Sequence, residues 1–257
     1  MILRGENLIK EYGPKKVVKG VSVQVQQGEI VGLLGPNGAG KSSLLSILAN
    51  EVKSKHRILF KDKNISEWKV NDLSKHKAKF SQHNSNDIPL EVKDVVMMGR
   101  YPYFDAQPAQ EDYEAMNNMM YETDVFHLKE REYSTLSGGE KQRVHLSRVM
   151  AQLHNEIAHK VLFLDEPLNN LDVKHQYKAL EIIKKFTEKA NSAIVVLHDL
   201  NLAAQYADKV LLMKSGRVAA CGTPAEVFTA ENISEAYNFP CTICEHPITA
   251  KPMIIFG

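Results

Sequence analysis

The sequence predicts an α/β fold that combines a mostly parallel sheet, an antiparallel β portion near the N-terminus and an inserted helical subdomain. Two continuous apolar runs, Val161–Leu164 and Ala193–Leu197, have the length and composition of buried parallel strands. The amphipathic segment Gln176–Lys189 lies between them, so strands and helices alternate in this part of the chain. The middle of the chain is instead rich in Met, Glu, Asn and Tyr at helical spacing, which indicates the insertion.

The first third of the chain is expected to contain strands and turns, followed by one helix. The segment Val21–Val25 alternates apolar and polar residues and is rich in β-branched side chains, which is typical of a half-buried strand. After a turn at Gln26–Gly28, the run Glu29–Leu34 predicts a buried strand. A glycine-rich loop follows this strand, and Ser42–Ala49 predicts a helix behind the loop.

The change in composition sets the expected domain organisation. We predict a single domain over residues 1–257, because no repeat or low-complexity linker divides the chain. Within it, residues 1–87 and 156–257 are expected to form the α/β core, and residues 88–155 the helical subdomain.

Composition excludes some classes of function. The chain has 257 residues and a net charge of +1, from 32 basic and 31 acidic side chains, which argues against a nucleic-acid partner. No apolar run approaches the roughly 18 residues of a membrane helix, and the N-terminus lacks the basic-then-apolar pattern of a signal peptide. We therefore expect a cytosolic chain whose role at a membrane, if it has one, depends on a partner.

The three cysteines are expected to be free thiols, because the chain has the features of a cytosolic protein. Cys241 and Cys244 form a C-x-x-C pattern near His246, which is compatible with a metal or redox site. The alternative is two small apolar residues without a chemical role. We favour that alternative, because the sequence offers no second pair of ligands.

The glycine-rich loop matches the pattern G-x-x-x-x-G-K-[ST] and stands between the expected strand and helix. Glycines let the backbone curl so that successive N–H groups face phosphate oxygens, and the helix N-terminus adds a positive dipole. Lys41 would reach the β- and γ-phosphates, and the Ser42 hydroxyl would bind Mg²⁺. We therefore expect ATP to be held by Gly35, Pro36, Asn37, Gly38, Ala39, Gly40, Lys41, Ser42 and Ser43.

Two adjacent carboxylates follow the buried run Val161–Leu164. Burying charge is unfavourable, so Asp165 and Glu166 either end a strand in an exposed turn or serve a metal and a water molecule. The phosphate loop favours the second interpretation. Asp165 would then hold Mg²⁺, and Glu166 would orient or deprotonate the attacking water.

A second glycine-flexible anion site precedes another expected helix. Its residues are Leu136, Ser137, Gly138, Gly139 and Glu140, followed by Lys141, Gln142 and Arg143. On these residues the sequence resembles the ABC ATPase family, whose signature motif usually has glutamine in the fifth place. The resemblance covers nearly the whole chain and implies a P-loop NTPase (RecA-like) core.

The resemblance also implies roles for residues outside these motifs. Tyr12 occupies the position of an aromatic residue that stacks on adenine, and Gln82 that of a glutamine that contacts Mg²⁺ and links to membrane subunits. Asp172 matches the loop that crosses the dimer interface. His198 matches the switch histidine near the γ-phosphate, and joins Lys41 and Glu166 as a catalytic candidate.

The same resemblance implies the assembly. Two copies would dock head to tail as a homodimer, so that Ser137, Gly138, Gly139 and Glu140 of one copy face the ATP held by the other. The expected cofactors are ATP and Mg²⁺. The expected partners are two transmembrane permease subunits and a periplasmic or surface substrate-binding protein. The chain would lie peripherally on the cytoplasmic face of the cell (inner) membrane.

The expected cargo also follows from resemblance. Met97–Tyr103 and Gly222–Phe228 are similar to stretches in importers for iron chelates, haem and cobalamin. The segment His154–Lys160 and the ending His246–Thr249 are similar to hemin-import ATP-binding proteins in particular. We expect haem, with ferric siderophore and cobalamin as alternatives. A non-transport ABC ATPase is the alternative class, although such proteins usually carry coiled-coil insertions or a second cassette.

Overall fold

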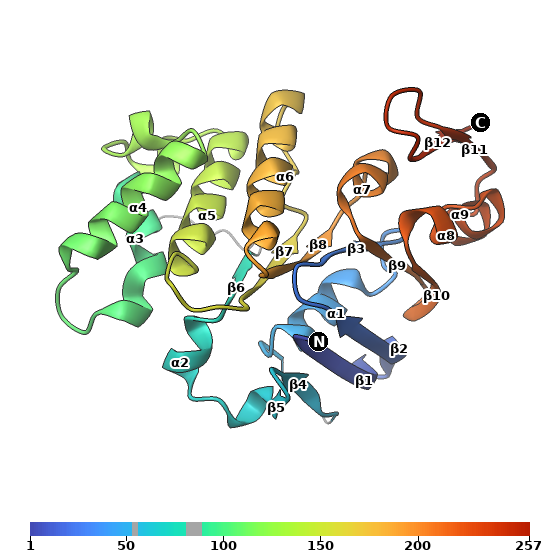
Figure 1. The fold of residues 1–257 in the computed structure, drawn as a ribbon, viewed down its shortest axis with the longest axis horizontal. Coiled ribbons are helices and arrows are strands. Elements are labelled where there is room, and N and C mark those ends of the chain that lie inside the picture. Colours follow the sequence, from blue (N-terminus) through green and yellow to red (C-terminus); the bar gives the residue numbers. More distant parts are fainter. Residues whose placement is uncertain (53–55, 81–88) are drawn as a thin grey trace.

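The computed structural model describes residues 1–52, 56–80 and 89–257. Its centre is a six-stranded sheet in the order β10-β9-β3-β8-β7-β6 (Figure 1). Strands β3, β6, β7, β8 and β9 run parallel to one another, and β10 pairs with β9 in the antiparallel direction. Their bounds are Ile30–Leu34 for β3, Lys77–Phe80 for β6, Val161–Asp165 for β7, Ser192–Val196 for β8, Lys209–Lys214 for β9 and Arg217–Gly222 for β10.

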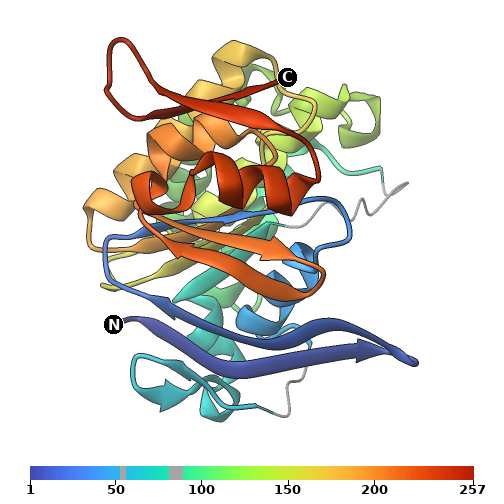
Figure 2. The same cartoon turned by 90° about the vertical axis from the view of Figure 1, so that its right-hand side faces the viewer.

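A smaller antiparallel sheet in the order β2-β1-β4-β5 covers one side of the large sheet (Figures 1 and 2). Its strands are β1 (Leu3–Tyr12), β2 (Lys15–Val25), β4 (Ile58–Phe60) and β5 (Lys63–Asn64). Helix α1 (Lys41–Leu48) lies between the two sheets. The predicted antiparallel portion at the N-terminus is therefore confirmed.

The two faces of the large sheet bury different cores, because successive strand residues point to opposite sides. On β3, Val31 and Leu33 pack with α1 and the antiparallel sheet, whereas Ile30 and Leu34 pack with helices on the other face. The helices of that face are α5 (Gly138–Gln152), α6 (Val173–Glu188), α7 (Leu200–Tyr206), α8 (Pro224–Val227) and α9 (Ala230–Tyr237). The core is thus a three-layer arrangement with the parallel sheet in the middle.

The helical part of the chain has its own small core, to which one face of α5 also contributes. It consists of α3 (Val92–Met97), α4 (Gln110–Glu122) and α5, with a 3₁₀ turn at Met98–Tyr103; the short helix α2 (Val70–Ser74) precedes β6. The described helices bear out an inserted helical subdomain, while its limits at residues 88 and 155 remain a prediction. Among the described residues, no helix has both the length and the apolar character needed to cross a bilayer.

A buried ion pair fixes the segment after α3. Arg100 and Asp112 are 5% and 3% exposed, and Arg100 Nε donates to Asp112 Oδ1 at 2.9 Å. Arg100 also donates to the carbonyl oxygens of Ala151 and His154, both at 2.8 Å. Gly99 is required beside it, because a Cβ there would lie 2.2 Å from the Arg148 carbonyl oxygen. Gly99 and Arg100 thus have a structural role. They connect the 3₁₀ turn to α4 and to the end of α5.

The chain ends in a two-stranded hairpin, β11 (Cys241–Glu245) and β12 (Pro252–Phe256), which lies over α8 and α9 (Figure 2). Cys241 and Cys244 are three residues apart on β11, so their side chains point to opposite faces of the hairpin. Strand geometry therefore separates the two thiols, and no cluster of three or more His, Cys, Asp or Glu suited to a metal occurs in residues 1–52, 56–80 and 89–257.

Candidate active site at the carboxyl end of the parallel sheet

The predicted phosphate loop spans the gap between β3 and α1, and its backbone is tightly enclosed. Gly40 precedes α1 with a left-handed φ of 101°. Gly35 has φ 135°, and a Cβ at this position would lie only 2.1 Å from the Met213 carbonyl oxygen of β9. Both positions therefore require glycine, for close approach as well as for backbone conformation.

The Lys41 ammonium group is folded into this loop. The residue is 5% exposed, and its Nζ donates to the carbonyl oxygens of Gly35 at 2.7 Å and Pro36 at 3.1 Å. Burial lowers the pKa of Lys41, and the nearby carboxylates of Glu166 and Asp165 partly oppose that shift. The cation therefore stands beside the curled backbone, where phosphate groups are expected to bind.

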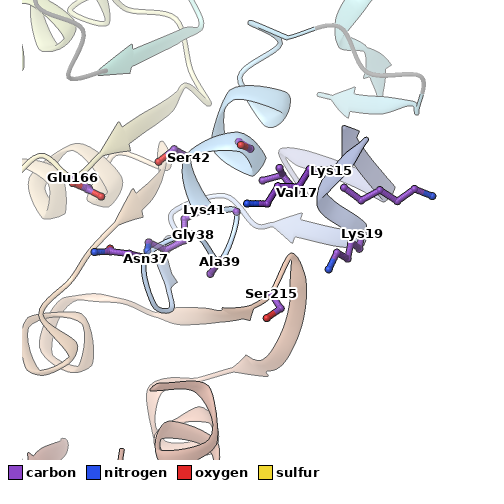
Figure 3. A pocket seen from close by; sticks show the side chains of 13 residues that line it. Lys15, Val17, Lys19, Asn37, Gly38, Ala39, Lys41, Ser42, Glu166 and Ser215 are labelled. Carbon is purple, nitrogen blue, oxygen red and sulfur yellow. The ribbon is translucent and has the colours of Figure 1, made fainter. Parts of the chain in front are cut away.

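A cavity of about 470 Å³ opens at this loop (Figure 3). Lys15, Lys16 and Lys19 of β2 give it a basic wall, and Ser215 approaches from the β9–β10 turn. The residues that line it are Lys15, Lys16, Val17, Lys19, Asn37, Gly38, Ala39, Gly40, Lys41, Ser42, Ser43, Glu166 and Ser215. A basic cavity at a helix N-terminus can hold a polyphosphate.

Tyr12 lies at the end of β1, next to the cavity rather than in its lining. It pairs with the lining residue Lys15 in the β1–β2 register and is 54% exposed. The ammonium group of Lys10 stands over its ring, 4.8 Å from the ring centroid. An exposed ring beside the cavity is compatible with adenine stacking, which stays a prediction. Gln82 lies outside the described residues.

Ser42 and Asp165 bring two oxygen donors together at the cavity. Ser42 is in the first turn of α1 and Asp165 ends β7, and the Ser42 Oγ donates to Asp165 Oδ1 at 3.0 Å. Burial raises the pKa of Asp165, although the Ser42 hydrogen bond and the Lys79 charge oppose the rise. A hydroxyl and a carboxylate side by side are the hard oxygen ligands that Mg²⁺ prefers, so this pair fits the predicted metal site.

Glu166 adopts a backbone conformation that is rare for residues other than glycine, with φ 53°. Its Oε1 lies 2.6 Å from Nε2 of His198, which follows strand β8. Burial alone would raise the pKa of Glu166, but the contact with His198, the Asn169 hydrogen bond and the Lys41 charge together leave that pKa below its usual value. The carboxylate is thus held ionised at the cavity, in the state that a general base requires.

Two residues without a role in the sequence analysis help to hold Glu166. Gln142, 8% exposed on α5, donates its side-chain amide to the Glu166 carbonyl oxygen at 2.9 Å. Asn169 donates to Glu166 Oε2 at 2.6 Å. Asn169 lies three residues after Glu166, and no motif of the sequence analysis included it.

The predicted signature motif forms the N-terminus of α5. Ser137 is the N-cap, and its backbone N–H and hydroxyl donate to Glu140 Oε2 at 2.7 and 2.8 Å. The Ser137 backbone N–H, followed by its hydroxyl, lowers the pKa of Glu140. Glu140 thus completes a capping box, which explains why glutamate is accommodated at the fifth position of the motif.

The signature motif and the loop after β7 form a second cavity of about 490 Å³. Its lining consists of Ser137, Gly138, Gly139, Glu140, Arg143, Asn170, Leu171, Asp172 and His175. Gly139 allows the two segments to meet, because a Cβ there would lie 2.7 Å from the Asn170 carbonyl oxygen. No residue lines both this cavity and the phosphate-loop cavity. The part of the chain that the structure describes therefore presents two separate cavities, one at each predicted anion site.

His175 joins this loop to the helical part, a contact that the sequence analysis did not anticipate. Its Nδ1 lies 2.7 Å from Asp172 Oδ1, and its Nε2 lies 3.4 Å from Asp124 Oδ2 just beyond α4. Asp172 also caps α6 by accepting the His175 backbone N–H at 2.9 Å. Asp172 is thus held beside the signature motif, and its place at a dimer interface stays a prediction.

Comparisons with known proteins show the family of this chain. The family model described as ABC transporter matches residues 18–169. Two proteins named "Hemin import ATP-binding protein HmuV" align over 255 residues, which is 99% of this chain. The protein of Vibrio parahaemolyticus is 39% identical, with 97% of its length covered. The protein of Pseudomonas fluorescens is 40% identical, with 99% of its length covered. An inward-facing metal-chelate type ABC transporter has the same fold, with a TM-score of 0.82, 23% identity and coverage of 100% of this chain and 97% of its own. The chain therefore belongs to the ABC transporter family, as an ATP-hydrolysing cassette.

Proposed function

We propose that this chain is the ATP-binding subunit of a hemin importer, which couples ATP hydrolysis to hemin uptake across the cytoplasmic membrane. The observation that carries the catalytic part is that Lys41, Ser42 and Glu166 line one basic cavity. Asp165 is hydrogen-bonded to Ser42, and His198 contacts Glu166. The cargo is proposed from the whole-length similarity to proteins named for hemin import.

The residues of the cavity have complementary chemical roles in this proposal. Backbone N–H groups of the phosphate loop and the Lys41 ammonium group bind the phosphates of ATP. Ser42 and Asp165 hold Mg²⁺, which neutralises phosphate charge when it is bound. Glu166 accepts the proton of the attacking water, and His198 orients Glu166 and stabilises the charge of the transition state.

Two copies are needed to complete each site. The signature motif lines a cavity of its own in this chain, apart from the phosphate loop. A head-to-tail pair would place Ser137, Gly138 and Gly139 of one copy over the phosphates held by the other, with Asp172 at the contact. We propose that this homodimer works beneath two transmembrane permease subunits, on the cytoplasmic face of the membrane, and receives cargo from a periplasmic or surface binding protein.

Glu166→Gln tests the hydrolysis mechanism. The variant is expected to bind ATP and Mg²⁺ but to lose at least about a hundredfold in kcat, since a general base is removed without a change of shape. It is also expected to elute as a dimer with ATP on a sizing column and as a monomer without it. Wild-type turnover in this variant would refute the role of Glu166, and indifference of its elution to ATP would refute the pairing.

The cargo is tested in cells that depend on one iron source. Deletion of the gene is expected to abolish growth on hemin and to leave growth on a ferric siderophore unchanged, and the Glu166→Gln gene should fail to restore it. Growth lost only on the siderophore, or cobalamin uptake lost instead, would assign the subunit to that cargo. A deletion without effect on any uptake would favour an ABC ATPase that does not transport.

A further inference from the structure

A tyrosine from the last helix touches the phosphate loop. Tyr237 ends α9, and its hydroxyl oxygen accepts the backbone N–H of Gly35 at 3.2 Å. The two residues are 202 positions apart in the sequence. The contact therefore links the C-terminal part of the chain to the first residue of the loop that is expected to hold ATP.

Gly35 is constrained by two further contacts. Its Cα faces the Met213 carbonyl oxygen so closely that no Cβ fits, and its own carbonyl oxygen accepts Lys41 Nζ at 2.7 Å. Tyr237 therefore binds the N–H of the same residue whose carbonyl oxygen accepts the Lys41 ammonium group. A shift of Gly35 would move the start of the loop and the lysine together.

The Tyr237 ring is itself held in place. Phe256 of β12 packs edge-on against it, with ring centroids 6.0 Å apart and an interplanar angle of 66°. Burial raises the pKa of Tyr237 to about 12, partly opposed by the Gly35 N–H, so the hydroxyl stays neutral at physiological pH. The C-terminal hairpin thus supports the ring that anchors the loop.

We propose that Tyr237 is a positioning residue for nucleotide binding, which keeps the phosphate loop in its binding conformation through Gly35. A loop that binds phosphate with backbone N–H groups must be ordered beforehand, and apparent affinity falls with the fraction of molecules in the competent conformation. Tyr237 contacts the loop at Gly35, so it is expected to affect ATP binding rather than the hydrolysis step. This inference rests on the proposed ATP-binding function of the loop.

Tyr237→Phe removes the hydroxyl and keeps the ring. The expected result is an ATP Kd and a KM that rise by about three- to tenfold, the range for loss of one hydrogen bond that selects the competent loop, with kcat unchanged. Hydrogen exchange in residues 30–40 should become faster. The matched control is Tyr206→Phe on α7, because the Tyr206 hydroxyl donates to Glu181 of α6 at 2.9 Å. This control should leave the ATP Kd, the KM and the hydrogen exchange unchanged.

Phe256→Leu is the second variant, because it keeps the hydroxyl and loosens the ring at a residue that is 45% exposed. Phe256→Leu should also raise the ATP Kd. If Tyr237→Phe cannot be purified, the ATP Kd of Phe256→Leu tests the inference. Wild-type Kd in the variants, or a fall in kcat with Kd unchanged, overturns the inference while the proposed function stands. Failure of the wild-type protein to bind ATP overturns both.

Discussion

Gln142 offers a direct test of how helix α5 controls the catalytic glutamate. It follows the signature motif, and its amide donates to the Glu166 carbonyl oxygen at 2.9 Å. Glu166 is held at φ 53°, a conformation that disfavours side chains with a Cβ. The Gln142→Met substitution keeps the length of the side chain and removes the donor.

The expected magnitude follows from two opposing terms. A carbonyl oxygen left without its partner in a buried setting costs about 1–3 kcal/mol, and the left-handed backbone of Glu166 stores roughly 1–2 kcal/mol. Loss of the Gln142 amide removes a hydrogen bond whose free energy is about as large as the backbone strain at Glu166. Without this hydrogen bond, Glu166 can relax and leave its catalytic position. A shift of about 1.4 kcal/mol corresponds to a tenfold change, so kcat should fall about tenfold.

Steady-state ATP hydrolysis and nucleotide binding measure this effect. In Gln142→Met, kcat should fall while the ATP Kd stays within about twofold, because the phosphate loop is not altered. Gln152→Met is the matched control: Gln152 lies on the same helix and donates its amide to the carbonyl oxygens of Ser74 and Lys77, away from the cavity. A folded Gln142→Met protein with wild-type kcat would refute the reasoning, and so would an equal loss of kcat in Gln152→Met.

Two further substitutions test the framework of the site. Asp112→Ala should lower the free energy of unfolding by about 3–5 kcal/mol, since it leaves the Arg100 charge buried without its carboxylate partner. Denaturant unfolding measures this loss of stability. The double replacement Arg100→Met with Asp112→Leu should recover most of it, because no buried charge remains. Equal stability of Asp112→Ala and the wild type would contradict the prediction. Gly35→Ala should abolish nucleotide binding, because its Cβ would lie 2.1 Å from the Met213 carbonyl oxygen. The control Gly13→Ala, at a positive φ but in open space, should bind ATP normally in the same fluorescence titration.

The parts of the site that depend on neighbouring residues in the chain were predictable. The conformation of the loop Gly35–Ser42 is determined locally, because the glycines, the lysine and the helix N-terminus lie within one short segment. Asp165 and Glu166 were identified as an acidic pair that ends a buried run, and the structure places them beside Ser42 and Lys41. Local sequence is sufficient here, because loop, strand end and helix start are each encoded in consecutive residues.

Some sequence signals had a different physical basis from the one expected. The Gly-Arg pattern at Gly99 and Arg100 was interpreted through resemblance to a class of importers, and the structure gives it a structural role in a buried ion pair. Glu140 was noted as a signature residue in place of the usual glutamine, and it closes the capping box of α5. In both cases the partner residue was needed to explain the pattern.

The amino-acid sequence alone determined the α/β class, the phosphate loop and the acidic pair, since each rests on periodicity or on spacing within a few residues. The signature motif was also identified from the sequence, through its resemblance to ABC ATPases. Only the tertiary structure decided which distant side chains hold these motifs: Gln142 on Glu166, His175 between Asp172 and Asp124, and Tyr237 on Gly35. These contacts join residues that are far apart in the chain. A lone glutamine, histidine or tyrosine has no local pattern, and its partner is chosen by how the sheet and the helices pack.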